Sequence, residues 1–242
     1  MKVSASQPFE IIYSLYEHEY LGYCIESFVV HKDHNGRLTL QHQNISSMNA
    51  EEFSSGLDDK DYELINIMDT MQQESVVKHF SKKKIKPGEF FLKTFGNPKS
   101  NELLIKEIEQ YMERRRSRVL PLILGKRLFE MGNDGEPTWK ELDVLDAPAT
   151  VRFHFMRNED NTHYFPTLRY KEEKVIWQYN NSYLLCKEPA WLVSDRKLYH
   201  FESGIDGNKL APFLNKKFIL IPKNIEETYY KKFVAPLVAA HD

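Results

Sequence analysis

The stretch YCIESFVVHKDHNGRLTLQH, residues 23–42, decides how the amino-terminal part of the chain folds. Two runs rich in aliphatic, aromatic and β-branched residues, 23–30 and 37–42, flank a polar cluster that contains Asn35-Gly36. Asn-Gly supplies the positive φ that a tight turn between antiparallel strands requires, so the stretch predicts a β-hairpin. Upstream of it, apolar residues alternate from Phe9 onward, which extends the predicted strands over residues 9–43.

From Ser47 to about Leu124, the spacing of apolar residues changes from that of strands to that of helices. One stripe at helical spacing consists of Leu64, Ile65, Met68 and Met71. A second stripe, just before a run of arginines, consists of Leu103, Leu104, Ile108 and Met112. Pro87-Gly88 and Gly96-Asn97-Pro98 are expected to divide this middle region into several helices.

After Gly125, short strand patterns return between turn clusters, and antiparallel pairing is expected throughout this half. A short helix is expected over residues 207–214. A closing helix is expected over residues 225–238, with an apolar stripe of Tyr229, Phe233 and Leu237. We therefore predict an α+β fold with an amino-terminal β-hairpin, a helical middle and an antiparallel β-rich carboxyl half closed by a helix. The predicted domains are residues 1–124 and 125–242.

Composition limits the classes of function. The chain has 242 residues, with 33 Lys and Arg against 35 Asp and Glu, so any basic face must be local. Cys24 and Cys186 each stand alone in an apolar run, which excludes a disulfide framework and fits reduced thiols in a cytoplasmic protein. No stretch approaches the roughly 18 apolar residues of a membrane span, so no membrane partner is expected.

Common catalytic and cofactor motifs are absent from the sequence. Gly125-Lys126 lacks the upstream glycine and the hydroxyl of a P-loop, and the dinucleotide, metalloprotease and nucleophile-elbow motifs do not occur. His154 and His163 flank a predicted turn, but whether they share a face depends on the register, and metal ligands normally come in threes or fours. We therefore expect a chain that is not itself an enzyme and has no cofactor and no metal.

Two basic runs supply the candidate nucleic-acid-binding residues. The first run is Lys82, Lys83, Lys84 and Lys86, and the second is Arg114, Arg115, Arg116 and Arg118. Local positive charge binds phosphate, and the forked guanidinium suits it. The alternative for each run is a solvated helix end, because cations late in a helix complement its dipole. Aromatic residues between Trp177 and Phe201 leave a similar choice between a base-stacking platform and cross-strand core.

Several segments between residues 164 and 237 resemble the amino-terminal accessory region of bacterial Swi2/Snf2-type helicases. They are YFPTLRY (164–170), EPAWLV (188–193), KLYHF (197–201), IDGNKLAPFL (205–214), FILIP (218–222) and the closing helix. Two earlier segments, PFEIIYSL (8–15) and MGNDGEPTW (131–139), look similar to the versions carried by Bacteroides-type members.

In that family, an ATPase motor that moves along duplex DNA follows this region. The resemblance implies a noncatalytic regulatory module whose partners are a downstream ATPase motor domain and duplex DNA. It transfers no catalytic residue, and with two cysteines in the chain it transfers no zinc site. The alternative, from another class, is a protein–protein interaction module with no nucleic-acid contact, which predicts an exposed apolar patch near the carboxyl end.

Overall fold

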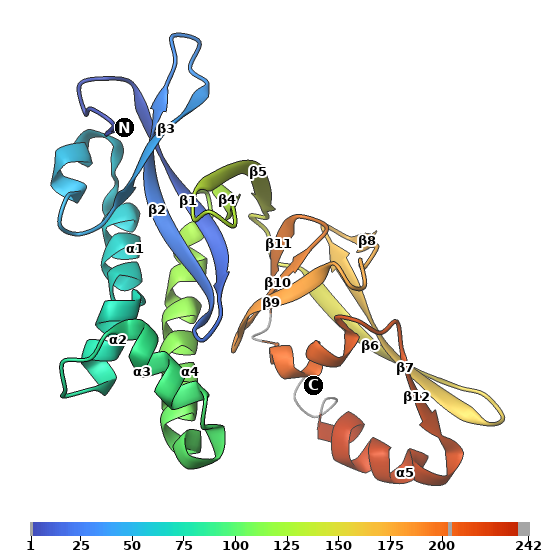
Figure 1. The fold of residues 1–242 in the computed structure, drawn as a ribbon. Coiled ribbons are helices and arrows are strands. Elements are labelled where there is room, and N and C mark those ends of the chain that lie inside the picture. Colours follow the sequence, from blue (N-terminus) through green and yellow to red (C-terminus); the bar gives the residue numbers. More distant parts are fainter. Residues whose placement is uncertain (1, 203–204, 237–242) are drawn as a thin grey trace. The chain divides into compact units, whose positions relative to one another are not determined.

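The computed structural model describes residues 2–202 and 205–236, in a mixed α and β fold (Figure 1). Its contacts form two compact units. Unit 1 comprises Met1–Asp146 and Arg196–Leu198, and unit 2 comprises Ala147–Asp195 and Tyr199–Asp242. Residues 125–146 belong to unit 1, because β4 in this stretch pairs directly with β1, the first strand of the chain. The predicted closing-helix residues Leu237 and Val238 lie outside the described residues.

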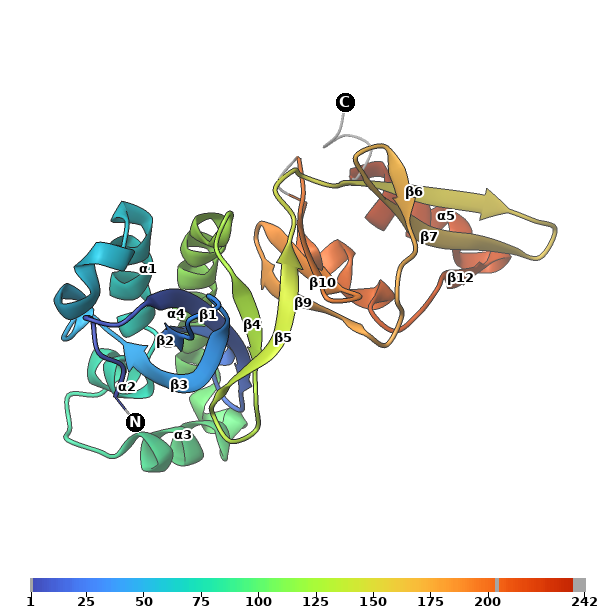
Figure 2. The ribbon, with the colours of Figure 1, turned by 90° about the horizontal axis from the view of Figure 1, so that it is seen from above.

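Unit 1 is built on a mixed sheet in the order β3-β2-β1-β4-β5. The strands are β1 (Phe9–His18), β2 (Gly22–Lys32), β3 (Leu38–Ile45), β4 (Leu128–Met131) and β5 (Pro137–Val144). Strands β1, β2 and β3 pair antiparallel, whereas Tyr13 of β1 pairs in parallel with Leu128 of β4. The strands curve strongly (Figure 2), and Ile12, Phe28 and Phe129 form a buried cluster on one face.

The predicted hairpin is present as β2 and β3, but its loop is longer than a two-residue turn. Lys32 pairs with Leu38, so five residues, Asp33 to Arg37, connect the strands. The Asp33 carboxylate accepts hydrogen bonds from the backbone N–H groups of Asn35 and Arg37, and Gly36 takes a φ of +76°. The glycine supplies the positive φ that the sequence predicts, and the aspartate stabilises the rest of the loop.

Helices cover the other face of the unit 1 sheet. They are η1 (Ala50–Gly56), α1 (Asp59–Asp69), α2 (Gln73–Phe80), α3 (Pro87–Phe95) and α4 (Pro98–Ile123). Most of the predicted stripes are buried, but Leu103 is 72% exposed, because a spacing of five and nine residues places it on the side of α4 opposite to the buried Ile108 and Met112. The prediction of Leu103 as a core residue is wrong for this reason.

A polar network joins α1 to the sheet. Asp58 and Asp61 form a reciprocal capping box at the start of α1, and Asp61 is buried. The Tyr13 hydroxyl donates to Asp61 Oδ1 at 2.5 Å, and Lys126 Nζ lies 2.7 Å from the same carboxylate and 2.8 Å from Asp58 Oδ2. Each buried polar group in this network therefore has a partner, as stability in a low-dielectric interior requires.

Unit 2 contains an antiparallel sheet in the order β12-β7-β6, with β8 also paired to β7. Its strands are β6 (Thr150–Arg157), β7 (Asn161–Tyr170), β8 (Glu173–Val175) and β12 (Ile219–Pro222). An antiparallel hairpin consists of β9 (Ser182–Lys187) and β10 (Ala190–Ser194), and β10 is also the neighbour of the next strand in the chain, β11 (Lys197–His200). Alternate residues of β7 are buried, from Thr162 to Leu168, which is the pattern of a sheet with one covered face.

Three expectations for the carboxyl half differ from the structure. Lys197 and Leu198 of β11 (Lys197–His200) pair in parallel with β5, so the pairing is not antiparallel throughout. The predicted helix at 207–214 is two 3₁₀ turns, Gly207–Lys209 and Ala211–Phe213, because Pro212 lacks the N–H that a continuous helix would use. The predicted closing helix is present from Glu226 to residue 236, but it is not α-helical throughout, because a π-helical turn, Tyr230–Val234, follows α5 (Glu226–Tyr229). A 3₁₀ turn, Lys223–Ile225, precedes α5, and together these elements form the closing segment.

Within the described ranges, no helix combines the length and the apolar composition needed to cross a membrane.

Candidate nucleic-acid interface

The lysine run occupies the loop between α2 and α3. The Ser81 hydroxyl bridges the start of this loop, donating to the Lys83 carbonyl at 3.1 Å and accepting from the Lys83 N–H at 3.2 Å. The loop ends at Lys86, because Pro87 is suited to the first position of α3. Ile85 is half-buried and anchors the loop, while Lys82, Lys83, Lys84 and Lys86 are exposed.

Three of these lysines surround one hollow, which we call the lysine hollow. It has a volume of about 330 Å³, and it is lined by Glu74, Val77, Lys78, Ser81, Lys82, Lys83, Lys84, Ile85 and Pro87. Its apolar lining comes from Val77, Ile85 and Pro87, and Lys86 lies outside it. The sequence analysis did not include Lys78, because it stands apart from the run. Its position in the last turn of α2, four residues before Lys82, is the signal that would have identified it.

The charge of this hollow is almost entirely positive. Residues 73–86 contain five lysines and one acidic residue, Glu74. In the part of the chain that the structure describes, no acidic side chain forms an ion pair with any of these five lysines. Ammonium groups without protein partners keep their full charge available for an external anion.

The arginine run is divided between internal and exposed roles. Arg116 donates from Nη1 to the carbonyls of Leu21 and Tyr23, at 2.9 and 3.3 Å, and forms an ion pair with Glu113. These bonds stabilise the turn between β1 and β2, which is why the Arg116 guanidinium is half-buried.

Arg115 is also tied to its neighbours. Its Nε donates to Thr70 Oγ1 at 2.8 Å, and its guanidinium carbon lies 3.1 Å from the centre of the Tyr111 ring. Partial burial lowers the pKa of Arg115, although an arginine keeps its charge in proteins. Arg118 is exposed and lies 3.8 Å from Glu63.

Arg114 is exposed beside a second hollow of about 380 Å³. This hollow is lined by His79, Phe80, Glu107, Gln110, Tyr111, Arg114 and Arg115. Its surroundings are electrically mixed, since residues 102–118 contain five basic and four acidic side chains. The structure thus gathers Lys82–Lys84 around one hollow, and places Arg114 and Arg115 at another.

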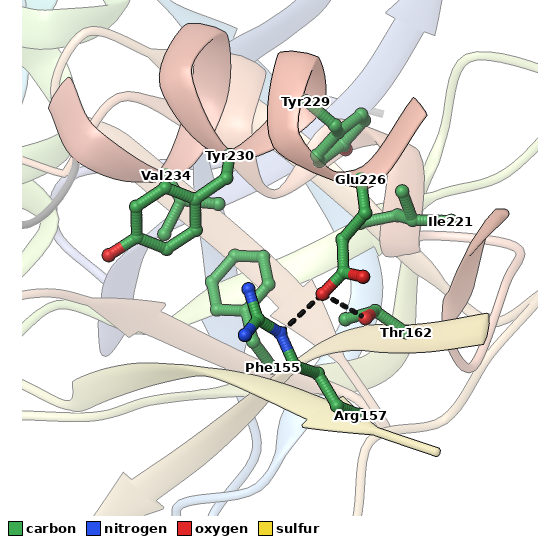
Figure 3. A pocket seen from close by; sticks show the side chains of 8 residues that line it. All are labelled: Phe155, Arg157, Thr162, Ile221, Glu226, Tyr229, Tyr230 and Val234. Atoms are coloured by element: carbon green, nitrogen blue, oxygen red, sulfur yellow. Dashed lines mark hydrogen bonds and ion pairs between the residues drawn. The ribbon is translucent and has the colours of Figure 1, made fainter. Parts of the chain in front are cut away.

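A third pocket, of about 290 Å³, lies in unit 2 between the sheet and the closing segment (Figure 3). Its polar groups bind one another: the Thr162 hydroxyl donates to Glu226 Oε1 at 3.0 Å, and Arg157 forms an ion pair with the same oxygen. Phe155, Tyr229 and Val234 form apolar walls. This arrangement fastens the closing segment to β6 and β7, and it contains no nucleophile–base pair.

The two histidines that flank the turn between β6 and β7 do share a face. Phe155 pairs with Tyr164 and Met156 with His163, so His154 and His163 point to the same side of the sheet. Each stacks on a phenylalanine, His154 on Phe165 and His163 on Phe218. Across residues 2–202 and 205–236, no group of three or more His, Cys, Asp or Glu is placed to hold a metal ion.

Comparisons of the chain with protein-family models, with curated proteins and with solved structures find no match.

Proposed function

We propose that the chain is a noncatalytic nucleic-acid-binding module whose lysine hollow contacts the phosphate backbone of duplex DNA. The observation that carries this proposal is the convergence of Lys78, Lys82, Lys83 and Lys84 on one hollow. Glu74 is the one acidic residue in its lining, and none of the four lysines forms an ion pair with a described residue. Phosphate contacts of this kind give affinity and position without reading sequence.

Of the two basic runs, the lysine run is the stronger candidate. Arg116 and Arg115 would have to give up hydrogen bonds within unit 1 before binding a phosphate fully. Arg114 and Arg118 are exposed, and they extend the proposed contact as secondary phosphate ligands.

On the basis of the resemblance to Swi2/Snf2-type helicases, we propose that this module is part of a cytoplasmic DNA-dependent ATPase. The ATPase motor would be supplied by a segment beyond Asp242, and the module would regulate it or hold its DNA. Reading the coding sequence past Asp242 tests this part of the proposal, since a P-loop is expected there.

The DNA contact is tested by the salt dependence of binding. We expect the variant with Lys82, Lys83, Lys84 and Lys86 all changed to Gln to bind a labelled duplex more weakly. The slope of log affinity against log salt should become shallower by about 2.7, because three of the four changed lysines line the hollow and each lost phosphate contact removes about 0.9. Fluorescence anisotropy over a salt series measures this slope.

The matched control is Lys60→Gln/Lys140→Gln, which removes exposed lysines elsewhere in unit 1. This control should keep most of the wild-type slope. Equal slopes for the wild type and the fourfold variant would refute the proposal, as would binding that does not weaken between 50 and 300 mM salt.

The alternative function, a protein–protein interaction module, also has an observation in its favour. Ile225, Tyr230 and Phe233 in the closing segment are 47%, 45% and 46% exposed, which is unusual for large apolar side chains close together in the chain. Partner binding through this patch would survive high salt and would be lost when Tyr230 and Phe233 are changed to Ser. DNA binding through the lysines would weaken at high salt and would be kept in that variant.

A further inference from the structure

The antiparallel sheet of unit 2 has one covered face and one open face. The covered face carries Phe155, Tyr164 and Ile221, against which the closing segment packs. Strand register assigns the other positions to the open face, because side chains of a strand alternate. These are Thr150, Arg152, His154 and Met156 on β6, Asn161, His163, Phe165, Thr167 and Arg169 on β7, Lys174 on β8, and Leu220 and Pro222 on β12.

One end of this open face is aromatic and apolar, although the solvated face of an antiparallel sheet is normally polar. His163 stacks on Phe218, with ring centres 4.8 Å apart and 2° between the planes. His154 stacks on Phe165 in the neighbouring row, at 5.1 Å and 20°. Exposure is 43% for Phe218, 50% for Leu220 and 61% for Met156, which leaves apolar surface open to a ligand.

The other end of the face is basic. Arg152, Arg169 and Lys174 are exposed there, and Arg169 has one weak ion pair, at 4.0 Å, with Glu172 in the following turn. None of the open-face positions of β6, β7, β8 and β12 is acidic. Lys216 and Lys217, both exposed, directly precede Phe218 in the chain.

Rings and cations on a sheet face whose strand positions carry no acidic residue suit one class of ligand. Unpaired bases stack on aromatic rings, and the phosphates that link them bind arginine and lysine. A duplex cannot use the rings, because its bases are already stacked and paired. His163 and Arg169 are six residues apart on β7, about 20 Å of strand, which is enough to follow a short run of nucleotides.

We propose that this open face is a binding platform for single-stranded nucleic acid. Bases stack at Phe165 and Phe218, and phosphates contact Arg152 and Arg169. The platform adds a second surface to the proposed function and does not require the lysine hollow, which lies in unit 1.

The first test is binding of labelled oligo(dT) and oligo(rU) by the full chain. We expect Phe218→Ala to weaken binding of the preferred oligonucleotide about five- to 150-fold, the effect of losing one stacked base. Its control is Trp139→Ala in unit 1, a ring that is 42% exposed and should not matter. Duplex binding should be unchanged by Phe218→Ala.

The second test keeps every ring in place. Arg152→Gln/Arg169→Gln removes exposed charges, so the fold should be retained, and the salt slope for the oligonucleotide should become shallower by about 1.4. Lys60→Gln/Lys140→Gln is again the matched control. Ultraviolet cross-linking of bound oligo(dT) should label peptides of β7 and β12.

Three results would overturn the platform. The first is unchanged oligonucleotide binding in both the Phe218 and the arginine variants. The second is loss of oligonucleotide binding in the fourfold lysine variant alone, which would place single strands in the lysine hollow. The third is that the chain binds no oligonucleotide while a partner protein cross-links to β7, which would make the face a protein-binding surface. If the wild type and the fourfold lysine variant bind duplex DNA equally, the proposed function fails, but oligonucleotide binding by the Phe218 and arginine variants can still be measured and interpreted.

Discussion

Replacing Lys126 by methionine should destabilise unit 1 by about 2 kcal/mol. The Lys126 ammonium bridges two carboxylates, at 2.7 Å from Asp61 and 2.8 Å from Asp58, and its side chain is 16% exposed. Methionine retains most of the stem that packs beneath the charge, so the change isolates the ammonium group.

The magnitude follows from the burial of the partners. Removing one member of a fully buried pair costs about 3–5 kcal/mol, whereas an exposed pair contributes about 0–1 kcal/mol. Asp61 is buried, but it keeps the Tyr13 hydroxyl and the Asp58 N–H as donors after the ammonium is gone. Asp58 is 60% exposed and regains water. The expected cost therefore lies between the two limits.

Hydrogen exchange of peptides from α1 and β1 measures this loss, because it reports local stability within one unit. The control, Lys140→Met, changes an exposed lysine of β5 and should alter exchange by less than about 0.5 kcal/mol. Asp61→Asn/Lys126→Met should recover part of the loss, since no buried charge is then left without a partner. The reasoning is refuted if Lys126→Met exchanges like its control.

The same network gives a dependence on pH. Hydrogen bonds from Lys126 and from the backbone of Asp61 lower the pKa of Asp58 to about 2. A carboxylate whose pKa is lowered by folding stabilises the native state above its unfolded pKa, about 3.9, and this contribution disappears as the pH falls toward 2. The contribution is small because Asp58 is largely exposed to solvent. Lys126→Met should flatten the acid-induced change in exchange between pH 4 and pH 2.

Two further predictions concern a glycine and a thiol. Gly36→Ala should lower the stability of the hairpin by about 1 kcal/mol, because alanine is strained at a φ of +76°. The control, Gly88→Ala in α3, should be neutral or stabilising, because Gly88 has no positive φ and a Cβ there would have no neighbour within 4 Å. Urea denaturation compares the two variants, and equal effects would contradict the assignment of strain to the loop. Cys24 is buried, and this burial raises the pKa of its thiol to about 11, so a thiol reagent at pH 8 should label it only after unfolding, and rapid labelling of the native chain would contradict its placement in the core.

Local patterns in the sequence predicted the features that depend on neighbouring residues. The polar cluster with Asn35-Gly36 predicted the β2–β3 hairpin, and the spacing from Leu64 to Met71 predicted the buried face of α1 and the turn after it. Exposure of the lysine run likewise follows from consecutive cations, which cannot all be buried.

Features that depend on distant partners could not be predicted. The pairing of Tyr13 with Leu128 joins residues far apart in the chain, and nothing local distinguishes a parallel partner from an antiparallel one. Arg116 looks like its neighbours in sequence, yet its carbonyl acceptors, Leu21 and Tyr23, lie 95 and 93 residues earlier in the chain. The register of β6 and β7 at His154 and His163 decides which residues share the open face of the unit 2 sheet. A shift of one residue would move the side chains of one strand to the opposite face, and the sequence does not fix this choice.

Unit 1 is assembled from two separate pieces of chain, since Arg196–Leu198 return to it after unit 2 has begun. No single peptide bond therefore divides the molecule into its two halves. A fragment that stops at Asp146 would lack the residues that pair with Asp143 and Val144, and its β5 edge would be open to association with other copies. Recombination that replaces unit 2 by another domain would therefore have to preserve Arg196–Leu198, a short segment of unit 1 that is encoded within unit 2.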